Sequence, residues 1–349
     1  MARIKVLVVD DSALAREMLS KGLSRDPEIE VVGTAQDVYA ARDKIVFKKP
    51  DVLTLDVEMP KMDGVDFLRK LMPQYPLPVV MVSALTAPGA QITLEALELG
   101  AVDFVLKPSS SFGNRLEEML SELSQKIKVA AFVDVSGYKA RSPIPSGSRR
   151  RRHLVGGTDK ILAIGASTGG TVALRQLIEE FPPNIPGTLI VQHMPPKFTK
   201  MFADRLNEKA KVSVYEAKDG DRVTAGQVLI APGGQHMRLK RSGGIYTVTC
   251  SEGPNINGHC PSVDALFESV AAEAGGNAVG ALLTGMGRDG AKGLRMMREH
   301  GAQTLAQDEA SSVVFGMPKE AYELGAVDTT TPLNQMTDAI LAKLERISP

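Results

Sequence analysis

The sequence has little cysteine, no excess charge of either sign and no long apolar run. Its 349 residues include only two cysteines, Cys250 and Cys260, which cannot form the disulfide framework of a small secreted protein. The 41 basic residues balance the 41 acidic ones, so overall charge does not favour nucleic acid or an anionic membrane as a partner. No apolar stretch approaches the roughly 20 residues of a membrane-spanning helix, and Met1–Lys5 lacks a signal-peptide core. We therefore expect a cytoplasmic protein without membrane insertion.

The chain is long enough for two domains of ordinary size. Up to about residue 127, apolar strand patterns alternate five times with helix patterns, which predicts a parallel sheet with helices on both faces. The composition then changes, because Ser142–Ser148 is rich in serine and proline and Arg149–Arg152 is wholly positive. No aromatic residues accompany these arginines, so we interpret the segment as a solvated linker in preference to a nucleic-acid or lipid site. We therefore expect a first domain at residues 1–127, a linker at 128–157 and a second domain at 158–349.

Polar side chains follow the strands of the first domain. Asp10 and Asp11 come after the first predicted strand and Asp56 after the third, while Ser83 and Lys107 follow the fourth and fifth. Ligands of such sheets bind at the carboxyl ends of the strands, where these side chains should meet. Three carboxylates repel one another unless a cation joins them, and their oxygens suit Mg2+. A lysine and a hydroxyl at the same edge suit a phosphoryl group. Any one acid alone also fits a strand-end cap, but the five positions together favour a site.

This pattern resembles the receiver domain of two-component response regulators, and the resemblance covers the whole first domain. It rests on Asp10-Asp11, Leu55–Gly64, Ser83-Ala84 and Lys107-Pro108. It implies a flavodoxin-like (βα)5 fold in which a histidine kinase is the phosphodonor to Asp56. It further implies that Asp10, Asp11, Asp56 and the Glu58 carbonyl hold Mg2+, and that Ser83 and Lys107 contact the phosphoryl group. Phe104 matches the switch aromatic of the family, although its spacing suits a plain core residue equally well.

In the second domain, the stretch Ile161–Gly170 changes from an apolar strand pattern to a helix pattern at Ser167. The small neighbouring residues allow a close approach to the Ser167 hydroxyl. The amides of Thr168 and the glycines after it would lie at a helix N-terminus, where they can hold negative charge. Two interpretations stay open at this point: a nucleophile beside an oxyanion site, or a phosphate-binding loop that happens to contain a serine.

Two further candidates lie at the ends of apolar strands, His193 as the last residue of Leu189–His193 and Asp289 in the loop after Ala278–Leu283. A neutral imidazole can take the proton of a serine hydroxyl, and a carboxylate on its other nitrogen orients it. The alternatives are a structural histidine and an Asx-type turn aspartate. His259-Cys260 offers a rival thiol nucleophile, but adjacent side chains tend to point apart. The sequence has no HExxH or CxxC spacing, which argues against zinc. The glycines at 165, 169 and 170 do not have the GxGxxG spacing of a dinucleotide site.

The remaining segments of the second domain predict a mixed architecture. Four short, turn-bounded segments favour hairpin strands over strand–helix units: Val212–Tyr215, Gln227–Ala231, Met237–Lys240 and Ile245–Thr249. An amphipathic helix is expected at Gln335–Ile347. We therefore predict two doubly wound α/β domains, the second a mostly parallel sheet with an added antiparallel hairpin region.

The second domain resembles the chemotaxis protein-glutamate methylesterases, the CheB family, in which a receiver precedes the catalytic domain. The matching segments are Ile164–Gly170, Gln192–Met194, Cys260–Asp264 and Leu283–Gly290. The resemblance implies Ser167 as nucleophile, His193 as general base and Asp289 as its orienter. It also implies that the Met286 amide and the turn at Thr168 stabilise the oxyanion, with no cofactor in the ester step.

The activity implied by this resemblance is hydrolysis of glutamate γ-methyl esters on chemoreceptors, with release of methanol, and deamidation of receptor glutamines, in chemotaxis adaptation. It also implies that the unphosphorylated receiver packs over the catalytic cleft and that phosphorylation relieves this inhibition. We expect a monomer. The alternative from another class is a response regulator with a non-enzymatic binding output, such as a DNA-binding module with a basic recognition helix. The strand-rich α/β pattern of the second half does not favour such a module.

Overall fold

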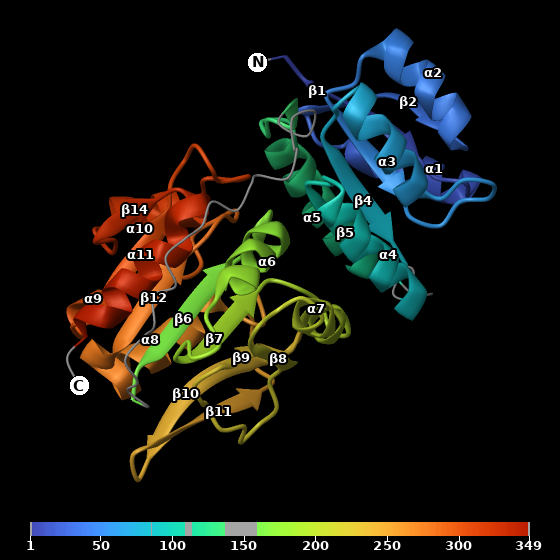
Figure 1. Ribbon diagram of the computed structural model, residues 1–349. Coiled ribbons are helices and arrows are strands. Elements are labelled where there is room, and N and C mark those ends of the chain that lie inside the picture. The colour runs from blue at the N-terminus through green and yellow to red at the C-terminus, as the bar shows by residue number, and fades with distance from the viewer. Residues whose placement is uncertain (1, 85, 109–113, 137–158, 348–349) are drawn as a thin grey trace. The chain divides into compact units, whose positions relative to one another are not determined.

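The computed structural model describes residues 2–84, 86–108, 114–136 and 159–347 (Figure 1). Contacts divide the chain into two compact units, Met1–Ser146 and Gly147–Pro349, which are described separately below. The proline-rich segment Ser142–Ser148 and the arginine run Arg149–Arg152 lie outside the described residues. The domain limits at 127 and 158 therefore remain predictions.

The first unit is built on a five-stranded sheet in the order β2-β1-β3-β4-β5, with every pair parallel. Its central strands β3 and β4 are buried along their whole length, as continuous apolar runs in a parallel sheet require. Helices α1 and α5 pack together, as do α3 and α4. The predicted (βα)5 sheet is confirmed. The elements are β1 Ile4–Val9, α1 Ala13–Leu23, β2 Ile29–Ala35, α2 Val38–Lys48, β3 Val52–Asp56, α3 Gly64–Gln74, β4 Val79–Ser83, α4 Ala87–Glu98, β5 Asp103–Leu106 and α5 Asn114–Ala130.

Side-chain caps start the helices of this unit at its ligand-binding edge. The hydroxyl of Ser12 accepts a hydrogen bond from the Ala15 amide at the start of α1, and Asp63 accepts from the Asp66 amide at the start of α3. Such caps satisfy amides that the helix leaves without a partner. These caps hold the loops after β1 and β3 in defined conformations.

The second unit contains a seven-stranded sheet in the order β14-β13-β12-β6-β7-β9-β8, again with every pair parallel. A separate antiparallel hairpin is formed by β10 and β11. The elements are β6 Ile161–Ala166, α6 Gly170–Glu180, β7 Gly187–Gln192, α7 Phe198–Asn207, β8 Ser213–Glu216, β9 Gln227–Ile230, β10 His236–Ser242, β11 Ile245–Ser251, α8 Val263–Ala274, a 3-10 turn Gly275–Asn277, β12 Ala278–Leu282, α9 Ala291–Glu299, β13 Gln303–Gln307, α10 Met317–Glu323, β14 Thr329–Thr331 and α11 Leu333–Arg346.

Two of the four predicted hairpin strands are parallel members of the main sheet. β8 pairs with β9 and β9 with β7, all in parallel, so the prediction was right only for β10 and β11. A connection of 10 residues, 217–226, joins β8 to β9, and none of these residues is helical. The pattern of short strands without an intervening helix was therefore misleading. The closing helix α11 is confirmed.

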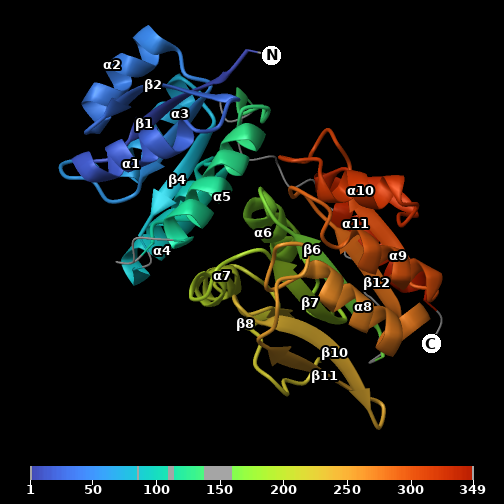
Figure 2. The ribbon, with the colours of Figure 1, turned by 180° about the vertical axis from the view of Figure 1, so that it is seen from behind.

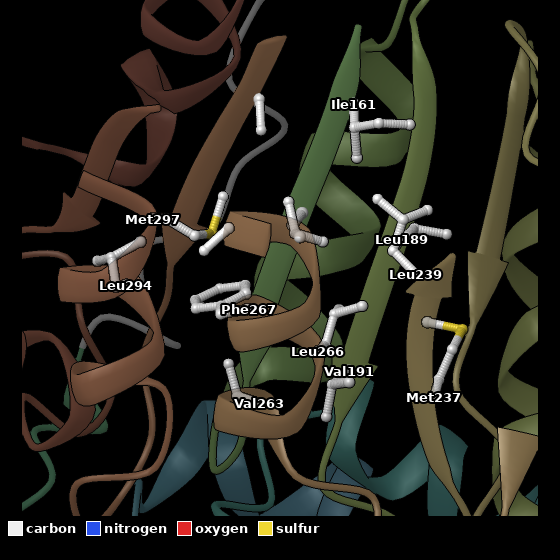
Figure 3. Close-up of a cluster of buried hydrophobic side chains, with 14 of the residues drawn as sticks. Ile161, Leu189, Val191, Met237, Leu239, Val263, Leu266, Phe267, Leu294 and Met297 are labelled. Carbon is white, nitrogen blue, oxygen red and sulfur yellow. The ribbon is translucent and has the colours of Figure 1, made fainter. Parts of the chain in front are cut away.

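The core of the second unit lies where helices α8 and α9 and the hairpin cover one face of the sheet (Figures 2 and 3). Ile161 of β6 and Leu189 of β7 point from the sheet into this cluster, and Phe267 of α8 lies among them with no exposed surface. Helices α6 and α11 of this unit also pack against each other. The sheet is thus held rigidly beneath the loops at its carboxyl edge.

Among the described residues, no helix combines the length and the apolar character needed to cross a membrane.

Replacing Phe267 by alanine should lower the free energy of unfolding of the second unit by about 3–5 kcal/mol, because it leaves a cavity in this core. Urea unfolding of the full chain measures the change. The matched control is Tyr322→Ala on α10, a residue that is 62% exposed; there we expect a change of less than about 0.5 kcal/mol. Equal losses in the two variants would contradict the placement of Phe267.

Candidate active site

Ser167 lies in a sharp turn between β6 and α6. The Gly170 amide donates to the Ser167 carbonyl at 2.7 Å, and Gly169 has a φ of +78°, a conformation that side chains disfavour. A Cβ on Gly170 would lie 2.7 Å from the Cβ of Ala166 and 2.2 Å from Oε1 of Gln192. Glycine is therefore required at both positions, and the turn holds the half-buried Ser167 at the carboxyl end of β6.

The neighbouring loops tie this turn on both sides. The Ser167 amide donates to the Thr284 carbonyl at 3.0 Å, and the Thr284 hydroxyl donates to the Thr168 carbonyl at 3.0 Å. From the other side, the Gln192 side-chain amide donates to the Ser167 carbonyl at 2.9 Å. A Cβ on Gly285 would lie 2.8 Å from that of Ser167, so the loop after β12 passes directly against the serine. This loop continues into Met286.

His193 follows β7, the strand next to β6, and its backbone amide donates to the Ala166 carbonyl at 3.2 Å. Its Nε2 lies 2.8 Å from Oδ2 of Asp289, and its side chain is 7% exposed. Among the described residues, its buried Nδ1 has no hydrogen-bond partner. With Asp289 on Nε2, Nδ1 is the nitrogen left to accept a proton. No hydrogen bond joins the Ser167 and His193 side chains among the described contacts; such bonds are often long outside the substrate complex.

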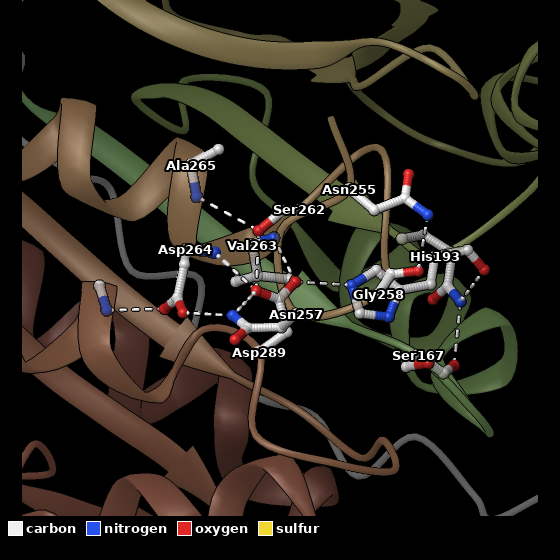
Figure 4. Close-up of polar contacts among 12 residues, drawn as sticks. Ser167, His193, Asn255, Asn257, Gly258, Ser262, Val263, Asp264, Ala265 and Asp289 are labelled. Atoms are coloured by element: carbon white, nitrogen blue, oxygen red, sulfur yellow. Dashed lines mark hydrogen bonds and ion pairs between the residues drawn. The ribbon is translucent and has the colours of Figure 1, made fainter. Parts of the chain in front are cut away.

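The Asp289 carboxylate is buried at the N-terminus of α8 and accepts hydrogen bonds from five groups (Figure 4). These donors are His193 Nε2, the Asn257 side-chain amide, the Ser262 hydroxyl, and the Val263 and Asp264 backbone amides. Burial by itself would raise the pKa of Asp289, but the hydrogen bonds from His193, Asn257 and Ser262 hold this pKa well below its usual range. The first-turn amides of a helix also favour negative charge. Asp289 is therefore an ionised partner for His193.

A second buried carboxyl, Asp264, lies beside Asp289. The Asn257 side chain donates to both, at 2.7 Å to Asp264 and 2.9 Å to Asp289. Burial and the nearby Asp289 charge raise the pKa of Asp264. The amide of Asn257 thus separates two carboxyl groups whose environments push their pKa values in opposite directions.

In the first unit, Asp10, Asp11 and Asp56 come together at the edge where β1 and β3 end. One side-chain oxygen of each lies within 4.8 Å of the others. Lys107 Nζ lies 2.8 Å from Asp10 Oδ2 and 2.8 Å from Asp56 Oδ2. Burial raises the pKa of Asp56 to about 6, against the opposing effect of Lys107. Three convergent carboxylates are the hard oxygen ligands that Mg2+ prefers, so these residues fit the ion.

This acidic site opens into a hollow of about 490 Å³ that Asp11, Asp56, Glu58 and Lys107 help to line. Ser83 is not turned toward it. The Ser83 Oγ is hydrogen-bonded to the Thr93 hydroxyl at 2.8 Å and donates to the Ala84 carbonyl. A contact of Ser83 with a phosphoryl group therefore remains a prediction that requires its side chain to turn. Phe104 is buried, as a core residue would be.

Both units match known families. Residues 162–340 match the family model described as CheB methylesterase, and residues 6–121 match the response regulator receiver domain. The chain belongs to the CheB methylesterase family. A relative from Syntrophotalea carbinolica named protein-glutamate methylesterase/protein-glutamine glutaminase is 60% identical over 97% of both chains. A relative of the same name from Escherichia coli O157:H7 is 50% identical over 99% of this chain and 98% of its own.

Among solved structures, the crystal structure of the Thermotoga maritima CheB methylesterase catalytic domain is similar to the second unit. It has a TM-score of 0.52 and 38% identity, and the match covers 52% of this chain and 97% of that one. The predicted family, its α/β fold with a receiver and a catalytic domain, and the predicted enzyme class are thereby confirmed.

The geometry brings together the predicted serine, histidine and aspartate of this methylesterase family, at the ends of the adjacent strands β12, β6 and β7. Thr168 is buried beside Ser167, and Met286 is half-buried in the loop after β12. Sequence reasoning gave no role in the triad to four residues around them: Gln192, Asn257, His259 and Ser262. One of these, Asn257, had a visible signal, because the dipeptide Asn257-Gly258 is typical of a tight hairpin turn.

Replacing Asp289 by asparagine should reduce the free energy of unfolding at pH 7 by about 2–4 kcal/mol. The NH2 group of the asparagine side chain would face buried hydrogen-bond donors and leave them without an acceptor. The folded-state pKa of Asp289 lies below its unfolded value of 3.8. Its stabilisation is therefore present above that value and is lost as pH falls through the folded pKa. The difference in free energy of unfolding between wild type and variant should stay constant from pH 8 to 5 and become smaller below about pH 4.

Urea unfolding across this pH range measures this difference. The control is Asp204→Asn on α7, whose side chain is 57% exposed in an ion pair with Lys200; its effect should stay below about 1 kcal/mol. A difference for Asp289→Asn that grows toward acid would contradict the assigned charge of this carboxyl.

Proposed function

We propose that the second unit hydrolyses glutamate γ-methyl esters on the cytoplasmic part of chemoreceptors and releases methanol, in chemotaxis adaptation. The names of its relatives support this substrate, and they support deamidation of receptor glutamines by the same acyl chemistry. The observation that carries the proposal is the 2.8 Å contact of His193 Nε2 with the ionised Asp289, beside the turn that presents Ser167. A binding module has no need of a buried imidazole oriented in this way.

In the proposed reaction, His193 Nδ1 takes the proton of the Ser167 hydroxyl while Oγ attacks the ester carbonyl. The tetrahedral intermediate collapses and the C–O bond to the methoxy group breaks; methanol leaves with the proton from His193. Water, deprotonated by the same nitrogen, then cleaves the acyl-enzyme to glutamate and free Ser167. Asp289 stays charged and stabilises the imidazolium in both steps. No cofactor enters this sequence.

The oxyanion is proposed to lie between the turn at Thr168 and the Met286 amide. The turn leads into the N-terminus of α6, whose first amides favour negative charge. The loop that carries Met286 is held in place, because the Gly285 carbonyl accepts a hydrogen bond of 2.8 Å from the Met317 amide. Backbone donors held in this way need little reorganisation when charge develops on the carbonyl oxygen.

The receiver is proposed to control this reaction. A histidine kinase phosphorylates Asp56, with Asp10, Asp11, Asp56 and the Glu58 carbonyl holding Mg2+. The ion, when bound, supplies positive charge that offsets the charge of the phosphoryl group. Lys107 already contacts Asp56, and Ser83 turns from Thr93 toward the new group. The phosphoryl group carries about two negative charges in place of the one on the carboxylate, and it relieves an inhibition of the catalytic unit by the unphosphorylated receiver.

Replacing Ser167 by alanine should abolish methanol release from methylated receptor while leaving the urea unfolding curve close to that of the wild type. The nucleophile is removed, but the backbone turn that its neighbours enforce remains. Ser242→Ala, at an exposed position of the hairpin, is the matched control and should keep full activity. Residual turnover above a few per cent in Ser167→Ala would refute the assignment.

Replacing Asp56 by asparagine should remove the stimulation of methanol release by a small phosphodonor with Mg2+. A fragment that starts near residue 155 should be more active than the unphosphorylated full chain, because it lacks the inhibitory receiver. Initial rates of methanol release, at equal concentrations of the catalytic unit, give both comparisons. Equal rates for the fragment and the full chain would exclude inhibition by the receiver.

A further inference from the structure

His259, at the end of a tight turn beside the candidate active site, has no role in the mechanism above. Ile256 and His259 pair with each other through two backbone hydrogen bonds of 3.0 Å, and Asn257 and Gly258 form the two-residue loop between them. Both loop residues have positive φ, +51° and +87°. Asn-Gly is the preferred dipeptide for a loop with this backbone, so the local sequence determines the turn.

Contacts on both sides hold the turn in place. His236 is buried on β10, and its Nε2 donates to the Pro254 carbonyl at 2.9 Å, while its Nδ1 accepts from the Ser262 amide at 3.2 Å. The Gly234 amide donates to the Cys260 carbonyl at 3.1 Å. Both ends of the turn are therefore fixed to the hairpin and to the start of α8.

The two side chains of this turn reach the two members of the acid–base pair. Asn257 donates to Asp289 and Asp264, as described above, and Figure 4 shows it lying against Asp289. The imidazole of His259 stacks on that of His193, with ring centroids 3.7 Å apart and planes inclined by 13°. One face of the His193 ring is thus covered by a second flat ring.

We propose that His259 is a positioning residue for His193, whose ring its stacked imidazole holds in the plane that keeps Nε2 on Asp289 and leaves Nδ1 for Ser167. This inference rests on the proposed esterase function. A single hydrogen bond to Asp289 fixes one atom of the His193 ring but not its tilt about that bond. The stacked face removes this freedom and excludes water from one side. Because the role is steric and aromatic, it needs a flat ring at 259 rather than an imidazole.

The test uses the full chain, treated with a small phosphodonor and Mg2+, and measures kcat and KM for methanol release from methylated receptor. His259→Leu removes the flat face at similar volume, and should lower kcat about 10- to 100-fold while KM changes little, since misplacement of a catalytic group has costs of this size. His259→Phe restores a flat ring and should recover kcat to within about fivefold of the wild type, because an aromatic face still stacks on the imidazole. His300→Phe, at an exposed histidine on the end of α9, is the matched control and should leave both constants unchanged.

Two readouts separate this role from a general loss of structure. The NMR signal of the His193 Nε2 proton in its hydrogen bond to Asp289 should be retained in His259→Phe and broadened or lost in His259→Leu. The rate at which a fluorophosphonate labels Ser167 should follow the same order, and this measurement needs no receptor. If His259→Leu fails to fold, His259→Phe alone decides, because a kcat reduced more than about 10-fold in a folded Phe variant contradicts a steric role.

Equal kcat in wild type and His259→Leu would overturn the proposal, and so would a Phe variant as slow as the Leu variant. Absence of methanol release from the wild type, with normal labelling of Ser167 and the expected order among the variants, would instead refute the proposed substrate and leave the positioning role of His259 supported.

Discussion

The buried negative charge of Asp289 is the constraint on which the catalytic unit depends. A carboxylate with almost no exposed surface is tolerated only when hydrogen bonds replace its lost hydration. Its donors come from the end of β7, from the turn at Asn257 and from the first residues of α8. Segments far apart in the sequence must therefore meet for the charge to be stable. The same hydrogen bonds orient His193. The folding of these segments and the chemistry of the site therefore both depend on the buried Asp289 carboxylate.

The two units use the same edge of a parallel sheet for different chemistry. In the first, β1 and β3 end in acids that lie within 4.8 Å of one another and are bridged by Lys107, an arrangement suited to a cation and a phosphoryl group. In the second, β12, β6 and β7 end in loops that carry an aspartate, a serine and a histidine. Glycine at 285 lets the loop after β12 approach the serine closely, and glycines at 169 and 170 leave room for Val313 and Gln192. Both units offer the carboxyl ends of a parallel sheet, and the side chains at those ends decide which chemistry each unit carries.

Much of this organisation could be predicted from the sequence because apolar strands followed by single polar residues are a local signal. Asp10, Asp56, Ser167, His193 and Asp289 were all recognised in this way. What failed depends on tertiary contacts. The strands β8 and β9 are as short as hairpin strands, and only the pairing of β9 with β7 and of β8 with β9 shows that they are parallel. The direction of Ser83 depends on Thr93, ten residues away. The stacking of His259 on His193 required the turn at Asn257-Gly258 to be placed beside β7.

The central claim is that Ser167, activated by His193 and Asp289, forms the acyl-enzyme. The most direct measurement is rapid acid quenching of the full chain during turnover of methylated receptor, followed by mass spectrometry of its peptides. The account predicts a γ-glutamyl ester on Ser167 that accumulates with the first methanol released. Methanol release with Ser167 unmodified and the acyl group on Cys260, a thiol whose pKa burial raises, would contradict it.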